Sequence, residues 1–377
     1  MSTHTARPSR AAFATALLLS VSAWSGAALA DGGTGPIPDG HAPAGVMVDH
    51  MHKAGEFMVG YRYSWSKMSG DTLRGTGAVD DTQIRHNACL LPGEDPHAHD
   101  THNHCAMKQS EMTMQMHMLD LMYAPTDWLT LMLMPQWMTM DMTMSPVAGA
   151  AMGGGHDEHG DEHGDADHMG SHSHGTDGFG DTIFGALVKI SDGPGYHLHT
   201  GMMFSAPTGS TSEKGSSGNL THYMMQLGSG TWDFMPSLTY TGHAGRFSWG
   251  VQLAGVIRME DENDEGYRLG DVFQATGWGA YRLTDWLSAS VRLLHTNQSE
   301  IEGHYNAAHG HGSPPDFARN YGGRYFDVGF GVNFVVPEGA LKGHRLSVEW
   351  LQPVRDDVNG YQQERDGTLY ANWSKAF

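Results

Sequence analysis

The sequence predicts an all-β fold, a transmembrane antiparallel β-barrel of about twelve strands with long extracellular loops and short periplasmic turns. Three observations lead to this prediction. The N-terminus has the features of an export signal. The remaining chain alternates apolar and polar residues over short runs, and the gaps between these runs are alternately long and short.

The first thirty residues read as a targeting segment. Arg7 and Arg10 precede a short apolar run, and Ala28-Leu29-Ala30 fits the small-residue pattern of a cleavage site. No later stretch approaches the ~20 apolar residues that a membrane-spanning helix needs. We therefore expect a signal peptide at 1–30, an N-terminal periplasmic segment at 31–54 and an outer-membrane β-barrel at 55–377, located in the bacterial outer membrane.

The alternating runs after residue 54 have the length and periodicity of barrel strands. They lie near Gly55–Ser66, Met112–Tyr123, Trp128–Met142, Phe179–Ile190, Gly195–Ser205, Thr231–Thr241, Arg246–Met259, Leu269–Arg282, Trp286–Asn297, Gly322–Val335, His344–Gln352 and Gly367–Phe377. Long gaps such as Lys67–Glu111 and Thr143–Gly178 alternate with short ones such as Ser191–Pro194. A soluble β-sandwich, the competing fold, has little reason to keep its long loops at one end.

The two faces of these runs differ in polarity. Leu287, Ala289 and Val291 alternate with Ser288, Ser290 and Arg292. An arginine is costly in a soluble core, whereas a wet barrel lumen accepts it. Aromatic residues at strand ends fit an interfacial girdle: Trp128, Tyr281, Trp286 and Trp373. The expected partners are outer-membrane lipids and, through the C-terminal Phe377 strand, the barrel-insertion machinery.

Charge and cysteine content narrow the possibilities further. The net charge is −20, with 22 Lys and Arg against 42 Asp and Glu, which argues against nucleic acid as a partner. Cys89 and Cys105 are the only cysteines and fall in one predicted loop. In an oxidising export route we expect them to form a disulfide, with a metal-binding pair as the alternative.

Parts of the second half resemble a known family. The segments are Leu227-Gly228-Ser229-Gly230-Thr231-Trp232-Asp233, Pro236-Ser237-Leu238-Thr239-Tyr240 and Gly277-Trp278-Gly279-Ala280-Tyr281. They are similar to outer-membrane proteins named for the phenol meta-degradation pathway, over roughly residues 179–377. The resemblance implies a transporter-like barrel, with aromatic compounds suggested by the family's name. It supplies no functional residues.

Histidines cluster in the predicted long loops, where neighbouring carboxylates would attract cations. Imidazole is a common ligand of zinc, copper and nickel. The candidate metal ligands in these loops are His97, His99, His102, His104, His156, His159, His163, His168, His172 and His174. A solvated low-complexity loop is the alternative interpretation.

Methionines line one face of two predicted strands. The candidate ligands there are Met112, Met114, Met116, Met118, Met132, Met134, Met138 and Met140, and His197, His199 and Met203 share one face of a third strand. The opposite faces are rich in leucine, which suits lipid, so the methionines are expected to face the lumen. Thioether and imidazole ligands suit a soft ion such as Cu(I). Adaptable packing of an occluded lumen is the alternative.

These observations predict an outer-membrane channel or transporter-like barrel for small solutes, binding or passing transition-metal ions, copper above others, as cargo or ligand. No cofactor is required. The alternatives are a channel for small hydrophobic or aromatic compounds and a surface metal-sequestering protein with a plugged barrel. Enzymatic activity is not expected, because no catalytic motif occurs and Ser290 and His295 fall on opposite faces of one predicted strand.

Overall fold

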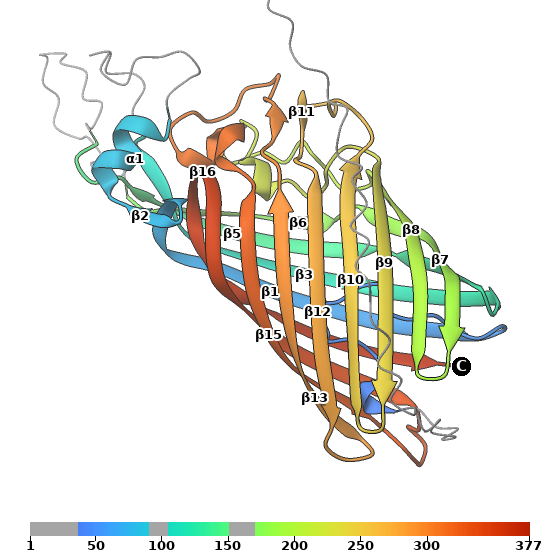
Figure 1. Cartoon of the computed structure of the whole chain (residues 1–377). Helices are drawn as coiled ribbons and strands as arrows, with labels where there is room; N and C mark the ends of the chain where they lie inside the picture. The colour runs from blue at the N-terminus through green and yellow to red at the C-terminus, as the bar shows by residue number, and fades with distance from the viewer. Residues whose placement is uncertain (1–36, 90–104, 151–169) are drawn as a thin grey trace, which may run out of the picture.

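The computed structural model describes residues 37–89, 105–150 and 170–377. One antiparallel sheet dominates it and closes on itself through the pairing of β1 with β3 (Figure 1). The predicted barrel is therefore confirmed. The strands of this sheet, besides the short β2 (Gly77–Val79), are β1 (Phe57–Gly75), β3 (Met107–Thr126), β4 (Leu129–Met134), β5 (Gln136–Pro146), β6 (His172–Phe179), β7 (Thr182–Gly193), β8 (Tyr196–Ala206), β9 (Asp233–Ala244), β10 (Phe247–Arg258), β12 (Val272–Arg282), β13 (Leu287–Gln298), β15 (Gly323–Val335) and β16 (His344–Ala376).

Two crossings of the wall are interrupted. β4 and β5 are separated by Pro135, which has no N–H to donate to a neighbouring strand. The gap between β6 and β7 lies alongside, since β4 pairs with β7 and β5 pairs with β6. β4 and β5 together therefore make one crossing of the wall, and β6 and β7 together make another.

The last labelled strand, β16, crosses the wall twice. Residues 345–358 pair with β15, while residues 358–376 pair with β1. The chain reverses around Gly360, which has a φ of 57° that glycine adopts without strain. The even strand number expected from the sequence is obtained when the two arms are counted separately. The loop predicted between Gln352 and Gly367 is wrong, because both arms of β16 continue as strands up to this reversal.

The two ends of the barrel differ, as the loop lengths predict. Short turns join β7 to β8, β9 to β10 and β12 to β13, and the C-terminus lies at the same end (Figure 1). The backbone N–H of Phe57, at the start of β1, donates to the carbonyl of Phe377 (3.2 Å). The opposite end carries the long loops, with α1 (Asp81–Asn87), β11 (Tyr267–Arg268), β14 (Glu302–Gly303), η2 (Tyr223–Met225), η3 (Pro314–Asp316) and η4 (Ala318–Asn320).

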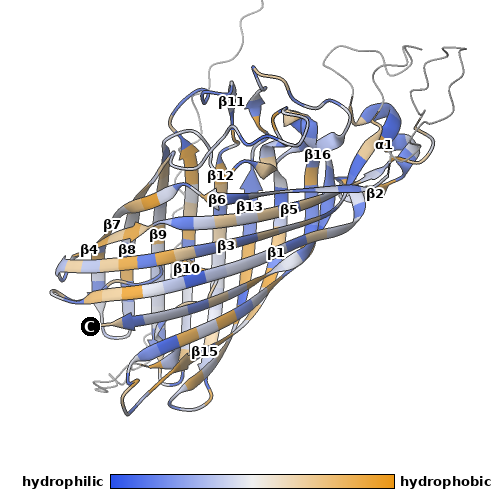
Figure 2. Cartoon of the chain, turned by 180° about the vertical axis from the view of Figure 1, so that it is seen from behind, coloured by the Kyte–Doolittle hydropathy of each residue, from blue (hydrophilic) through white to orange (hydrophobic). Residues whose placement is uncertain are grey.

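Alternation along the strands separates a lipid face from a lumen face. Val291 and Leu293 are about half exposed, at 48% and 51%, while the alternate residues Ser290 and Arg292 are buried. Figure 2 shows apolar and polar residues alternating along the strands of the wall. Trp128, Tyr281 and Trp286 are exposed near strand ends, consistent with the expected girdle. No helix in the described ranges is long and apolar enough to cross a membrane.

The segment before β1 departs from the expected organisation. Its described residues, 37–54, begin with η1 (Pro38–Gly40) and lie against the inner face of the wall rather than outside the barrel in the periplasm. Ala42, Ala44, Val46 and Val48 in this segment are buried. We refer to residues 37–54 as the plug. The signal-peptide prediction falls outside the described residues.

Candidate functional site

The methionines of β3, β4 and β5 form a continuous inward-facing surface. We call the eight predicted residues the methionine ladder: Met112, Met114, Met116, Met118, Met132, Met134, Met138 and Met140. The register places methionines opposite one another, as in Met114↔Met140 and Met116↔Met138. Leu119, Leu131 and Leu133 on the other face are exposed. The predicted facing is therefore confirmed, while a metal-binding role of these residues stays a prediction.

The ladder packs against other apolar side chains of the lumen. Met118 and Met134 belong to a buried cluster that also contains Met203 of β8, and Met47 and Met51 of the plug pack against it. Met112 and Met140 belong to a second cluster with Met225 and Leu227 of a long loop. Dense contacts of this kind are what adaptable packing of the lumen would produce.

Two cavities occupy the lumen along the ladder. The larger, about 590 Å³, is lined by Met114, Met138 and Met140 and by residues of the long loops. The smaller, about 270 Å³, is lined by Met116, Met118 and Met134 and by the plug. Tyr370 and Gln274 line both cavities, so the two adjoin one another. The lumen is thus partly open between its two ends.

Several charged residues in the wall of the lumen occur as pairs. Arg292 of β13 contacts Glu349 of β16 at 2.7 Å, and both side chains are almost fully buried. Arg62 contacts Asp120 at 3.2 Å, and Arg258 pairs with Asp233. Arg365 lies 2.7 Å from Asp327 and 2.5 Å from Asp356. Opposite charges held this closely offset the cost of burying each ion, so these parts of the lumen carry little uncompensated charge.

A cap of three loops (207–232, 259–271 and 299–322) closes the end of the lumen opposite the plug. Its centre is a buried cluster that includes Tyr223, Tyr267, Tyr305 and Tyr321. The rings of Tyr223 and Tyr305 stack with centroids 4.3 Å apart. Tyr223 and Tyr321 also line the larger cavity. Burial raises the pKa of Tyr223 and of Tyr321, so both phenols stay protonated and uncharged.

A hydrogen bond between a histidine and an aspartate supports this cap. His222 Nδ1 lies 2.8 Å from Asp316 Oδ1, and Ser313 donates to the other carboxylate oxygen. Burial opposes ionisation of Asp316, but His222 and Ser313 outweigh it and hold the pKa of Asp316 below its ordinary value. The ring centroid of His174, near the start of β6, lies 5.2 Å from that of His222. The ring of His172 lies 6.0 Å from that of His174.

Hydrogen bonds from several strands hold the plug. Arg282 donates to Asp39 (2.7 Å), Gln252 to the carbonyl of Met47 (2.8 Å), and Asn372 to that of Ala44 (2.7 Å). The Gly45 N–H donates to Glu349 (2.6 Å). A Cβ at position 45 would lie 2.3 Å from Arg292, so only glycine fits there without displacement. These donors and acceptors come from strands far apart in sequence, so the position of the plug could not be predicted from local sequence patterns.

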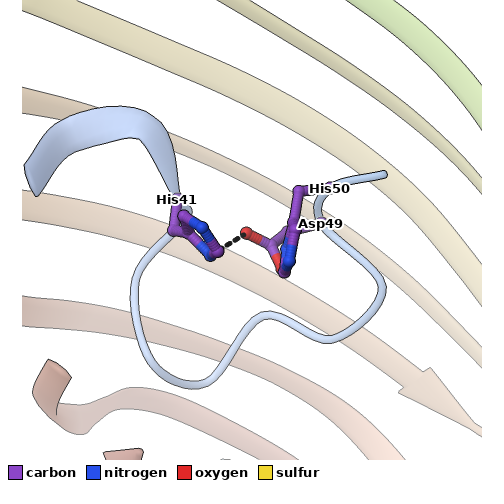
Figure 3. A group of neighbouring side chains, drawn as sticks. All are labelled: His41, Asp49 and His50. Atoms are coloured by element: carbon purple, nitrogen blue, oxygen red, sulfur yellow. Dashed lines mark hydrogen bonds and ion pairs between the residues drawn. The ribbon is translucent and has the colours of Figure 1, made fainter. Parts of the chain in front are cut away.

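Three polar side chains of the plug lie together (Figure 3). His50 Nδ1 is 2.8 Å from Asp49 Oδ1, and His41 Nδ1 is 3.9 Å from Asp49 Oδ2. Burial lowers the pKa of His41 well below its usual value, and the nearby charge of Arg345 acts in the same direction. Burial opposes ionisation of Asp49, but His50 outweighs it and the pKa of Asp49 is lowered. The sequence analysis missed this group, although His41, His50 and His52 are dense in a short segment before the first strand.

The structure distributes the remaining predicted ligands. His199 is buried and lies 2.9 Å from the carbonyl of Val48, so it supports the plug. His197 is exposed beside Asp192 and does not join the methionine ladder. The loop histidines His97, His99, His102, His104, His156, His159, His163 and His168 lie outside the described residues. The expected disulfide between Cys89 and Cys105 is present, with Cα atoms 5.3 Å apart.

Comparisons with known proteins agree with this architecture. An outer-membrane channel from Pseudomonas putida F1 has a TM-score of 0.53 and 15% identity, covering 87% of this chain and 97% of that one. The TodX monoaromatic hydrocarbon channel, as a mutant, has a TM-score of 0.42 and 10% identity over 87% of this chain and 91% of that one. A FadL homologue from Pseudomonas aeruginosa has a TM-score of 0.36 and 10% identity, covering 85% and 89%. Among curated proteins, no match was found.

The family match by sequence confirms the resemblance over the second half of the chain. The model described as "Putative MetA-pathway of phenol degradation" matches residues 146–364, which is more than half of the 377 residues. Together with the closed barrel, this match places the protein in the bacterial outer membrane. The chain belongs to the family described as the putative MetA-pathway of phenol degradation.

Proposed function

We propose that this barrel is a channel for small hydrophobic solutes, aromatic compounds among them, with the plug and the cap as its two gates. The cavity of about 590 Å³ carries the proposal, because it lies inside the barrel between these gates. Its volume falls within the range of about 300–1,000 Å³ that is usual for small-molecule sites.

The chemistry of the cavity favours an apolar solute. Methionine, leucine and tyrosine side chains form much of its lining, including Met138, Met140, Leu294 and Tyr223. Of the charged residues that also reach it, Arg258 and Asp233 are paired with one another, and Asp181 accepts hydrogen bonds from Gly209 and Ser229. An uncharged aromatic molecule could therefore contact thioethers and ring faces without separating a charge from its partner. The family's name, which refers to phenol degradation, supports the same class of solute.

Transport through the barrel is favoured over catalysis at its rim. Ser290 is buried on the lumen side of β13 while His295 is exposed on the other face, so these two residues do not form a hydrolase pair. A role in copper passage has less support, because several ladder methionines, among them Met112, Met118 and Met134, are buried in apolar clusters with residues of the plug or the cap.

Uptake by intact cells tests the proposal, because the lipopolysaccharide leaflet slows apolar compounds that would cross a simple vesicle unaided. Uptake of radiolabelled toluene or phenol is compared in cells with and without the gene, with labelled glucose as the polar control. Met138→Trp fills part of the larger cavity. Leu133→Trp adds similar bulk on the exposed lipid face of the wall. The lipid-face variant is therefore the matched control.

We expect the parent and Leu133→Trp to raise uptake of the aromatic probes, and Met138→Trp to reduce that gain several-fold. Folding of each variant is checked by its heat-dependent mobility on gels. Equal aromatic uptake with and without the gene, or glucose uptake that matches it, contradicts the proposal.

A further inference from the structure

We propose that His41, Asp49 and His50 bind one divalent transition-metal ion, and that this ion holds the two ends of the plug's loop together. One potential ligand atom from each of these residues lies within 4.8 Å of the other two (Figure 3). The site uses no residue of the methionine ladder and none of the predicted loop histidines. It does not depend on the nature of the solute that the barrel conducts.

The ligand set suits a first-row divalent ion. Two imidazoles and one carboxylate are a common combination for Zn²⁺, with bonds of about 2.0–2.2 Å and ligand atoms roughly 3.4 Å apart in a tetrahedral arrangement. The carboxylate of Asp49 is close to both rings: Oδ1 lies 2.8 Å from His50 Nδ1, and Oδ2 lies 3.9 Å from His41 Nδ1. Relative to that spacing, the contact with His50 lengthens by about 0.6 Å and the contact with His41 shortens by about 0.5 Å, so small side-chain adjustments bring the ligand atoms around one ion.

The carboxylate is also held in place from outside the group. The Ala42 N–H donates to Asp49 Oδ2 at 2.9 Å. Hydrogen bonds to a ligating carboxylate fix its orientation and are a regular feature of protein metal sites. The ring centroids of His41 and His50 are 3.9 Å apart, so the backbone already brings the two imidazoles together.

Unpaired polar atoms and free space give independent support. His50 Nε2 and His52 Nε2 are buried without a hydrogen-bond partner in the described part of the chain. The side chain of His52 is only 7% exposed, and its ring centroid lies 5.0 Å from that of His50. A cavity of about 40 Å³ is lined by His41, Asp49 and His50. This space is sufficient for an ion or a water molecule, which occupies about 30 Å³ in the liquid.

The positions of the ligands explain what the ion would do. His41 follows η1, whereas Asp49 and His50 lie at the far end of the same loop, so one ion closes the loop that forms the body of the plug. The charge of Arg345 lies near His41 and opposes a cation there. Arg345 donates to the carbonyl of Ile37 at 2.9 Å, and the carboxylate of Asp49 lies close to both imidazoles of the site.

Peptide-resolved hydrogen exchange of the full mature protein tests the proposal locally, so that metal bound by loop histidines does not obscure the result. Exchange of peptic peptides spanning 37–52 is measured without metal, with Zn²⁺ and with Mg²⁺. At a Zn²⁺ concentration of 100 times the dissociation constant, opening of the plug should become about 100-fold rarer. Exchange should slow accordingly. Mg²⁺, which prefers oxygen ligands, should have no such effect.

Variants identify the ligands. His41→Phe removes one imidazole but keeps a ring against His50, and it should abolish the Zn²⁺-dependent protection. His197→Phe is the matched control, because His197 also pairs with an aspartate, Asp192 at 2.9 Å, but lies outside the plug. This variant should respond to Zn²⁺ as the parent does. His50→Phe serves as a second test should His41→Phe fail to fold.

The proposal is overturned by an unchanged exchange of residues 37–52 at saturating Zn²⁺ in the parent, or by equal protection in His41→Phe. Neither result bears on solute uptake, which is measured separately. Failure of the metal site and failure of the proposed channel function are therefore distinguishable.

Discussion

The buried ion pair between Arg292 and Glu349 gives the sharpest test of how the lumen is built. The two side chains are 3% and 0% exposed, and Arg292 Nε lies 2.7 Å from Glu349 Oε1. Glu349 also accepts the N–H of Gly45 in the plug at 2.6 Å. The change we consider is Arg292→Met, which keeps an apolar stem and removes the cation.

The expected cost follows from this burial. Solvent does not screen the carboxylate that remains, so loss of its partner should lower the free energy of unfolding by about 3–5 kcal/mol. The double variant Arg292→Met/Glu349→Leu removes both charges. It should lie within about 1 kcal/mol of the parent, a margin that includes the lost hydrogen bond to Gly45.

Guanidinium unfolding of the barrel in detergent, followed by tryptophan fluorescence, measures both values. Single-channel recordings on the same variants show whether the plug stays in place, because Glu349 accepts a hydrogen bond from Gly45 of the plug. A single variant that loses less than 1 kcal/mol contradicts the reasoning. So does a double variant that is as unstable as the single one.

Three further outcomes are expected. Replacing the four ladder methionines of β4 and β5 with leucine should spare folding, at less than about 1.5 kcal/mol per change, and should leave Cu(I) binding, measured by competition with a chromogenic chelator, unchanged if the methionines serve as packing; weakened binding would favour the copper alternative. Replacing Cys89 and Cys105 with serine should cost about 3 kcal/mol in unfolding under oxidising conditions, as expected for a closed loop of this size, and nothing relative to the reduced parent. The pKa of Asp316 is lowered by folding, so its contribution to the cap is present above its ordinary pKa of 3.8 and is lost as the pH falls through the lower folded value. The near-UV circular dichroism of the tyrosine cluster should therefore diminish on acidification below about pH 4, whereas Asp316→Asn should show a weakened signal already at neutral pH.

The wall of the barrel could be predicted from the sequence because its signals are local. Alternation such as Val291-Arg292-Leu293 assigns one face to lipid and the other to the lumen, and the lengths of the gaps between strands determine which end carries the loops. The same alternation placed the methionines inward. The C-terminal strand, the disulfide and the family resemblance were readable for the same reason, since each depends on residues close together in the chain or on a short motif.

The contents of the lumen depended on contacts between distant residues. Gly45 meets Glu349, Asp39 meets Arg282, and His222 meets Asp316, and no periodicity relates the members of these pairs. The plug has too few residues in regular secondary structure to be recognised from sequence periodicity. Its polar backbone groups form hydrogen bonds with side chains of strands that closure of the barrel brings around it. The sequence by itself therefore determined that a barrel would form and which side chains it would enclose. Only the tertiary structure decided that the enclosed space would be divided by a plug and a cap, because that division rests on pairings that exist once the sheet has closed.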